Sequence, residues 1–286
     1  MKRLLVAGIA AAAFSGAPVL AADMAVKAPP PPSVAAPASN WTGFYIGGNA
    51  GYGWSADPSV SFSPNQTTSS VANLTLLVGT PAPVSFPVSG AAGGLQLGYN
   101  WQVVPKWLIG FETDFDLSDV KGNGMSAIPA PFSLAHQPLG QTANERLDWF
   151  GTVRARLGYL LTNSVLLYGT GGFAYGRVAE NISFSNPSAP GGSAGDGTCS
   201  AASTCYAGAS GHIAEGWTAG AGVEYALTSQ WTIKAEYLYV DLGGNSFNEN
   251  VLAPGLIPPF ASTSSFAAHY GDLTFQVARG GFNYRF

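Results

Sequence analysis

From residue 41 onward, apolar and polar side chains alternate at every second position over long stretches, which is the pattern of β-strands with two different faces. In the clearest case, 107–118, Trp107, Ile109 and Phe111 stand on one face while Glu112 and Asp114 stand on the other. Another of these segments, 165–178, is rich in glycine, and its alternation has no clear phase. The eight segments with strand character are 44–55, 95–102, 107–118, 147–159, 165–178, 217–225, 231–239 and 278–286.

The connections between these segments alternate in length. Short turns fall at 103–106, 161–164 and 228–230, and long loops at 56–88, 119–145, 179–212 and 243–270. Short turns on one side and long loops on the other are typical of outer-membrane barrels, and an even strand number returns both termini to the short-turn side. We therefore predict an all-β fold, an eight-stranded antiparallel transmembrane up-and-down β-barrel with four long extracellular loops and periplasmic turns.

The polarity of the two faces separates this fold from a soluble eight-stranded barrel, which keeps apolar residues inside. An eight-stranded lumen is only wide enough for side chains, so the apolar faces of all eight segments would overfill it. Charged residues make up only 10% of the chain, against about 25% in soluble domains. We therefore expect the apolar faces to meet lipid. The expected aromatic girdle at the short-turn end is Trp101, Trp107, Tyr159, Tyr225, Trp231 and Phe286.

The first forty residues have a different composition. Lys2 and Arg3 precede an apolar run at 4–14, and small residues lead up to Ala21, which together predict a signal peptide over 1–21. A transmembrane helix is the alternative, but Gly16 and Pro18 interrupt it. Residues 22–40 form a Pro/Ala-rich periplasmic tether or spacer that favours extended polyproline II, and 41–286 form the barrel.

Charged residues on the inward faces must find partners, because a narrow lumen excludes bulk water. We expect an acidic set and a basic set of similar size to pair with each other there. Across the turn 228–230, Glu224 should face Lys234. This arrangement either closes the lumen with ion pairs or lines a gated or selective pore. The acidic set is Glu112, Asp114, Asp116, Asp148, Glu224 and Glu236, and the basic set is Arg154, Arg156, Arg177, Lys234, Arg279 and Arg285.

Other candidate chemistry is sparse. A formal net charge of −4 argues against nucleic acid as a partner. Cys199 and Cys205 suit a loop disulfide in an oxidising compartment better than a metal site. The histidines fall in or beside three different long loops, where haem ligation is the alternative to simple solvation; they are His136, His212 and His269. No phosphate loop, zinc-protease motif or nucleophile elbow is present, so we expect no cofactor and no enzyme.

Three stretches carry a family resemblance: WTGFYIGGNAGYG at 41–53 after a KAPPPP tether, LYGTGGFAYG at 167–176, and VARGGFNYRF at 277–286. They resemble the major outer-membrane proteins of alphaproteobacteria, the porin-family or opacity-type barrels. The resemblance implies the outer membrane of a Gram-negative bacterium, contact with its lipid and lipopolysaccharide, and assembly by the barrel-assembly machinery through Phe282, Tyr284 and Phe286. It also implies surface exposure, envelope integrity, haem or host-factor contact in some relatives, and peptidoglycan attachment through Ala22-Asp23.

Three functions follow as hypotheses. The first is an envelope barrel with at most a narrow or gated pore. The second is a small-solute porin, whose conductance would change when Glu112 or Arg154 is neutralised. The third is a lipid-modifying enzyme, which needs a serine, a histidine and an acid together at one membrane rim. We favour the first.

Overall fold

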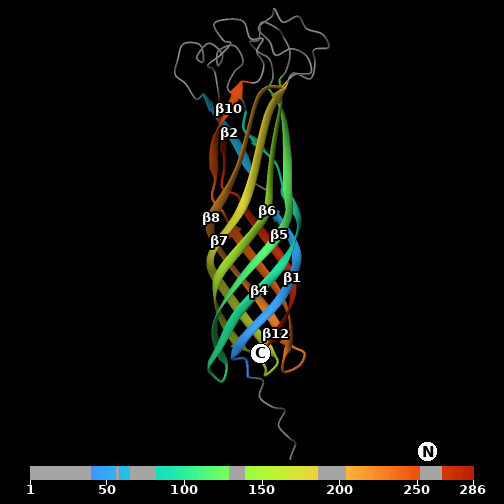
Figure 1. The fold of residues 1–286 in the computed structure, drawn as a ribbon, viewed down its shortest axis with the longest axis vertical. Helices are drawn as coiled ribbons and strands as arrows, with labels where there is room; N and C mark the ends of the chain where they lie inside the picture. Colours follow the sequence, from blue (N-terminus) through green and yellow to red (C-terminus); the bar gives the residue numbers. More distant parts are fainter. Residues whose placement is uncertain (1–39, 56–57, 65–81, 129–138, 186–203, 252–265) are drawn as a thin grey trace, which may run out of the picture. The chain divides into compact units, whose positions relative to one another are not determined.

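The computed structural model describes residues 40–55, 58–64, 82–128, 139–185, 204–251 and 266–286 (Figure 1). The predicted signal peptide 1–21, residues 22–39 of the tether, His136 and Cys199 lie outside these ranges. Residues Ser39–Phe286 form one compact unit, and the expected barrel starts at residue 41 within it. In the described part of the chain, no helix has the length and hydropathy needed to cross a membrane.

Eight long strands close into an antiparallel barrel, which confirms the predicted fold. β1 pairs with β4, and the long strands then pair in chain order from β4 to β9. β12 pairs with both β9 and β1 and so closes the circle. The strands are β1 Gly43–Ser55, β4 Val88–Val104, β5 Trp107–Ile128, β6 Leu139–Leu160, β7 Val165–Ser185, β8 Thr204–Ala226, β9 Trp231–Asp241 and β12 Thr274–Arg285.

Four shorter strands extend the wall at the long-loop end: β2 Ser59–Pro64, β3 Val84–Ser85, β10 Asn245–Val251 and β11 Phe266–Tyr270. There β10 takes over from β9 as the partner of β8, and β11, β2 and β3 continue the sheet. The predicted extent of the four long loops is therefore wrong, because strands occupy 59–64, 84–85, 119–128, 139–145, 179–185, 204–212, 245–251 and 266–270 within them. Outward positions there include the polar Asp119, Lys121 and Asn181, and most inward positions are apolar apart from Gln141, Glu145 and Glu180, so the apolar-out, polar-in alternation ends before the strands do.

The outward face of the lower barrel is apolar. On β5 the exposed side chains run Trp107, Ile109, Phe111, Phe115 and Leu117, and the next exposed ones are the charged Asp119 and Lys121. On β7 the exposed Arg177 and Asn181 likewise follow the exposed Phe173. These boundaries mark a lipid-facing band that begins at the short turns, and we call the strand portions beyond it the extension. Both Asn40 and Phe286 lie at the short-turn end.

β-Bulges separate the band from the extension. The register shifts between Leu117 and Val120 on β5, and between Leu147 and Trp149 on β6. A bulge inserts an extra residue, and on β6 it reverses which positions face inward, whereas on β5 even positions face inward on both sides of the irregularity. Below the bulge the even positions of β6 point inward, including Thr152 and Arg154, whereas above it odd positions such as Glu145 do so.

Candidate functional site

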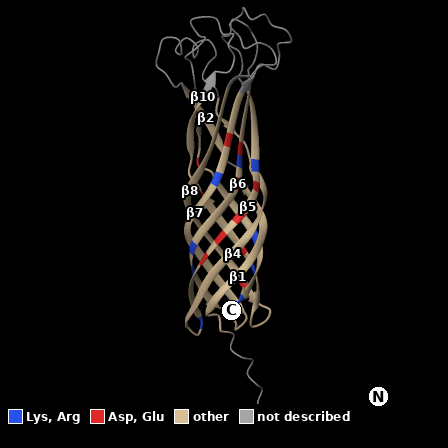
Figure 2. Cartoon of the chain, viewed as in Figure 1, with Lys and Arg blue, Asp and Glu red and all other residues tan. Residues whose placement is uncertain are grey.

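The lumen is filled by charged side chains that come from opposite walls of the barrel. In the strand order, three strands separate β5 from β9 in either direction, so these two strands face each other across the lumen. Glu112 of β5 accepts a bond of 2.8 Å from Lys234 Nζ of β9, which spans the full width. Figure 2 shows acidic and basic segments on several strands of the wall.

Two arginines tie the acidic residues together. Arg154 of β6 donates to Glu112 at 2.6 Å, to Asp114 at 2.9 Å and to Glu236 of β9 at 2.8 Å. Arg279 of β12 donates to Asp114 at 2.6 Å, to Asp116 at 2.8 Å and to Glu236 at 2.8 Å. All of these side chains are at most 1% exposed. We call the seven residues the lumen network: Glu112, Asp114, Asp116, Arg154, Lys234, Glu236 and Arg279.

A second ion pair lies closer to the short turns. Arg156 binds Glu224, and its guanidinium carbon lies 3.7 Å from the ring centroid of Tyr168. Asn283 donates to Glu224 at 3.0 Å, which helps to satisfy the carboxylate. Tyr45 joins the two groups, because its hydroxyl donates to Glu112 at 2.7 Å and accepts from Arg156 at 3.3 Å.

Inward-facing glycines make room for this packing. A Cβ atom on Gly98 would lie 2.3 Å from the Tyr45 ring, and one on Gly222 would lie 2.5 Å from the Tyr168 ring. Real Cβ atoms do not approach other atoms so closely, so these positions require glycine. The glycine-rich inward faces of β4 and β8 are therefore part of the lumen packing.

Apolar layers close the lumen on both sides of the charged layer. At the short-turn end, the fully buried Trp41 packs with Leu108 and Leu166, lies 4.5 Å from the Arg285 guanidinium, and donates from Nε1 to the carbonyl of Asn163 at 3.2 Å. On the long-loop side, inward apolar residues of β5, β6, β7, β9 and β12 form a core. It includes Val120, Leu147, Phe150, Val178, Leu238, Val240, Phe275 and Val277.

Three of the predicted lumen charges need comment. Arg177 and Asp148 do not face the lumen: Arg177 Nε lies 3.5 Å from Asp148, and half of the Arg177 side chain is exposed. The reason is the phase of the strands, since β7 places its even positions inward and the β6 bulge moves Asp148 off the inward face. Arg285 does face inward, but it packs against Trp41 at the rim and donates to the carbonyl of Ser229 at 2.8 Å.

The extension holds two buried carboxylates in the lumen above the membrane band. Glu145 of β6 lies directly opposite Glu180 of β7, and each is at most 3% exposed. Burial and the Glu180 charge raise the pKa of Glu145 from 4.5 to about 8. Burial also raises the pKa of Glu180, although Asn245 of β10 donates to it at 2.6 Å. At neutral pH this pair therefore holds a proton.

The two histidines that the structure describes do not converge. His212 Nδ1 lies 4.0 Å from Glu180 inside the extension, and burial lowers the pKa of His212. His269 of β11 instead contacts Ser63 at 2.7 Å and Ser246 at 2.9 Å through its two ring nitrogens. Over the ranges that the structure describes, no three ligating side chains group into a metal site. The expected disulfide stays a prediction, because Cys199 lies outside those ranges.

The three predicted assembly residues lie at the end of β12 near the short-turn edge. Phe282 and Phe286 point outward and are 55% and 78% exposed. Tyr284 packs edge-on against Trp231 and against Phe286, with ring centroids 5.1 Å and 5.3 Å apart. Trp101, Trp107 and Tyr225 are also exposed at this end, as expected for an interfacial girdle.

The sequence reasoning missed Trp41, Tyr45 and Tyr168 as lumen residues. Tyr45 and Tyr168 occupy inward positions of their strands, so a firm phase for β7 would have identified Tyr168. Trp41 precedes β1, where alternation gives no information. The apolar core was also missed, although Leu238 and Val240 continue the inward face of Lys234 and Glu236.

Comparison with known proteins places these features in a family. The chain is 36% identical over 297 residues to the 31 kDa outer-membrane immunogenic protein of Brucella melitensis biotype 1, with all of both chains covered. It is 28% identical over 260 residues to the 22 kDa outer membrane protein of Rhizobium leguminosarum bv. viciae, covering 86% of this chain and 89% of the relative.

Among solved structures, OprG from Pseudomonas aeruginosa matches 87% of this chain and 98% of its own, with a TM-score of 0.46 and 13% identity. A family model described as the outer membrane protein beta-barrel domain matches residues 7–286. The chain therefore belongs to the outer membrane protein β-barrel family, and its place is the Gram-negative outer membrane.

Proposed function

We propose that this outer-membrane barrel has a closed lumen and serves the envelope as a structural, surface-exposed protein. The observation that carries the proposal is the set of ion pairs that cross the lumen. Lys234 reaches Glu112 from the opposite wall, and Arg154 and Arg279 connect β5, β6, β9 and β12. A conducting channel needs a continuous water-filled path, and these side chains occupy its cross-section.

The layers above and below the lumen network support the same proposal. Trp41 covers the short-turn end, and Phe150 packs edge-on against Phe275 at 5.5 Å on the extracellular side. A hydrated ion would have to pass two apolar layers as well as a charged one, and desolvating an ion costs several kcal/mol or more. A porin with a charged lumen is the competing proposal.

The surface role rests on the extension and on the relatives. Strands β5 to β8 continue past the lipid-facing band, and their outward side chains there include the polar Asp119, Lys121, Arg177 and Asn181. The Brucella relative is named as an immunogenic outer-membrane protein. For this chain we propose exposure of the extension at the cell surface.

We further propose that the barrel is not an enzyme. Both ring nitrogens of His269 face serine hydroxyls, Ser63 at 2.7 Å and Ser246 at 2.9 Å. A general base for serine chemistry is normally oriented by a carboxylate on its second nitrogen, and here a serine takes that place. Hydrolysis of phospholipid or of acyl ester substrates by the purified barrel would contradict this proposal.

A liposome assay tests the closed lumen. The refolded mature barrel is placed in vesicles and challenged with an isotonic sugar such as arabinose. The proposal predicts swelling no faster than that of protein-free vesicles, while a porin would admit the sugar. In cells, deletion of the protein should increase sensitivity to detergent, and a barrel with intact lumen residues should restore resistance without increasing solute uptake.

A further inference from the structure

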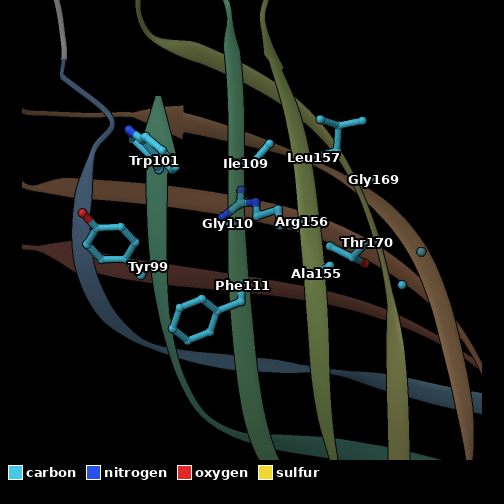
Figure 3. Close-up of a pocket in the computed structure, with 12 residues that line it drawn as sticks. Tyr99, Trp101, Ile109, Gly110, Phe111, Ala155, Arg156, Leu157, Gly169 and Thr170 are labelled. Carbon is cyan, nitrogen blue, oxygen red and sulfur yellow. The ribbon is translucent and has the colours of Figure 1, made fainter. Parts of the chain in front are cut away.

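The lipid-facing surface contains one hollow that the closed-barrel function does not use. A groove of about 870 Å³ opens on the outside of β4 to β8. Figure 3 shows Tyr99, Trp101, Ile109 and Phe111 along one side of it and Leu157 beyond them. Its volume falls within the roughly 300–1,000 Å³ typical of small-molecule sites. Unlike the lumen, it faces hydrocarbon.

Strand register explains the hollow. Phe111 lies beside Ala155, which lies beside Gly171 and then Ala219. Two residues closer to the turns, Ile109 lies beside Leu157 and Gly169, followed by Ala221. In these two rows the side chains on β5, and those of their β4 partners Tyr99 and Trp101, are large. The residues of the same rows on β7 and β8 are glycine or alanine. Tyr237 and Tyr239 of β9 end the small region on its far side.

The glycines of the floor are not needed for packing within the chain. A Cβ atom on Gly169 or Gly171 would meet a single atom, a carbonyl oxygen at 3.8 Å. By contrast, a Cβ atom on the inward Gly172 would lie 2.1 Å from the carbonyl oxygen of Val153. A larger side chain at 169 or 171 would fit a strand and lipid better than glycine does. The open space outside these two glycines leaves room for an acyl chain between the side chains of β5 and β9.

The charge at the lower end of the groove indicates which occupant. Lys106 lies in the turn between β4 and β5, is exposed, and places Nζ 5.9 Å from the ring centroid of Tyr159. Tyr159 and Trp107 form the row directly below Ile109 and Leu157. Among the described basic residues at this end, the other is Arg285, which is buried beside Trp41. A cation at the interface, at the lower end of an apolar groove, matches a lipid whose phosphate lies at that end and whose acyl chain extends into the groove.

We propose that this groove is a specific site for an anionic phospholipid of the periplasmic leaflet. One acyl chain lies on the floor formed by Ala155, Gly169 and Gly171, between the side chains of β5 and β9. The phosphate binds Lys106 at the level of the aromatic girdle. Because lipid and protein are equally apolar, affinity comes from close dispersion contacts with the backbone and from the charge pair rather than from removal of water.

Native mass spectrometry of the refolded mature barrel tests the site, with dipalmitoyl phosphatidylglycerol as the probe and dipalmitoylglycerol as its neutral counterpart. The wild type should retain one phosphatidylglycerol preferentially. Gly169→Leu/Gly171→Leu fills the groove and should weaken retention roughly tenfold. Lys106→Gln should weaken retention of phosphatidylglycerol roughly fivefold and leave retention of dipalmitoylglycerol unchanged.

Gly280→Leu is the matched control. Gly280 of β12 also faces lipid, and its Cβ would meet a single carbonyl oxygen at 3.8 Å, but the residue lies outside the groove. This variant should retain phosphatidylglycerol as the wild type does. Each variant is first checked for the heat-dependent gel shift of a folded barrel. Equal retention of phosphatidylglycerol by the filled variant and the wild type overturns the proposal. A filled variant that loses self-association but still retains phosphatidylglycerol overturns it as well. A channel measured in the same barrel would refute the closed lumen but not this site.

Discussion

Replacement of Arg154 by alanine is the sharpest stability test of the lumen network. Arg154 donates to Glu112, Asp114 and Glu236 at 2.6, 2.9 and 2.8 Å, and all four side chains are at most 1% exposed. Without it, three acidic groups lose a shared cation in a site that bulk water does not reach. Removing one partner of a buried ion pair typically costs about 3–5 kcal/mol, and three simultaneous contacts place this variant at the upper end.

The measurement is equilibrium unfolding in urea, with the barrel in phospholipid vesicles and tryptophan fluorescence as the probe. Arg177→Ala is the matched control, because Arg177 makes a half-exposed pair with Asp148 at 3.5 Å. The control should change the free energy of unfolding by no more than about 1 kcal/mol. The double variant Arg154→Ala/Glu112→Ala removes one charge of each sign and should lose less than the sum of its parts. A loss below about 1 kcal/mol in Arg154→Ala would refute the reasoning.

Three further predictions follow from the same structure. The pKa of Glu145 is raised from 4.5 to about 8, so between these values the folded state keeps a proton that the unfolded chain releases; stability should therefore fall as pH rises from about 4.5 to about 8. Glu145→Gln should reduce that fall, measured as urea midpoints at pH 5 and pH 9, with the exposed Asp119→Asn as control; parallel pH profiles for Glu145→Gln and the wild type would argue against a buried proton. Trp41→Ala removes a fully buried indole and its contact with Arg285, and should lower the free energy of unfolding by about 3–5 kcal/mol; an unchanged urea midpoint would show that Trp41 does not cap the lumen. Phe286→Ala changes a side chain that is 78% exposed, so it should cost less than about 1 kcal/mol in purified protein yet lower the amount of assembled barrel in cells; equal amounts on gels of unheated membranes would dismiss the assembly role.

Strand number, polarity and closure could be predicted from the sequence because a membrane barrel imposes alternation on every crossing. Phe111 and Glu112 show this directly, one facing lipid and the other the lumen. The same rule placed Arg154, Lys234 and Arg279 inward. It also put Glu224 opposite Lys234, and the two are Cα partners in the structure. Glu224 nevertheless binds Arg156 instead, because pairing across the lumen depends on side-chain reach and not only on register.

Alternation failed where the membrane no longer imposes it. Above the bulges, outward residues such as Asp119 and Lys121 meet water, so the strands of the extension carried no lipid signal. The bulge on β6 displaced Asp148, and the glycines of β7 concealed the phase that turns Arg177 outward. The lipid groove was not predicted either, since it depends on small residues from separate strands meeting in register.

Planar-bilayer conductance tests the closed lumen most directly. The mature barrel is refolded, shown to be folded by its gel shift, and inserted into a bilayer between salt solutions. The account predicts that wild-type barrels give no steady channels, because Lys234, Arg154 and Arg279 bridge the lumen between apolar layers. Steady ohmic channels in the wild type, with an ion selectivity that changes in Glu112→Gln, would contradict it.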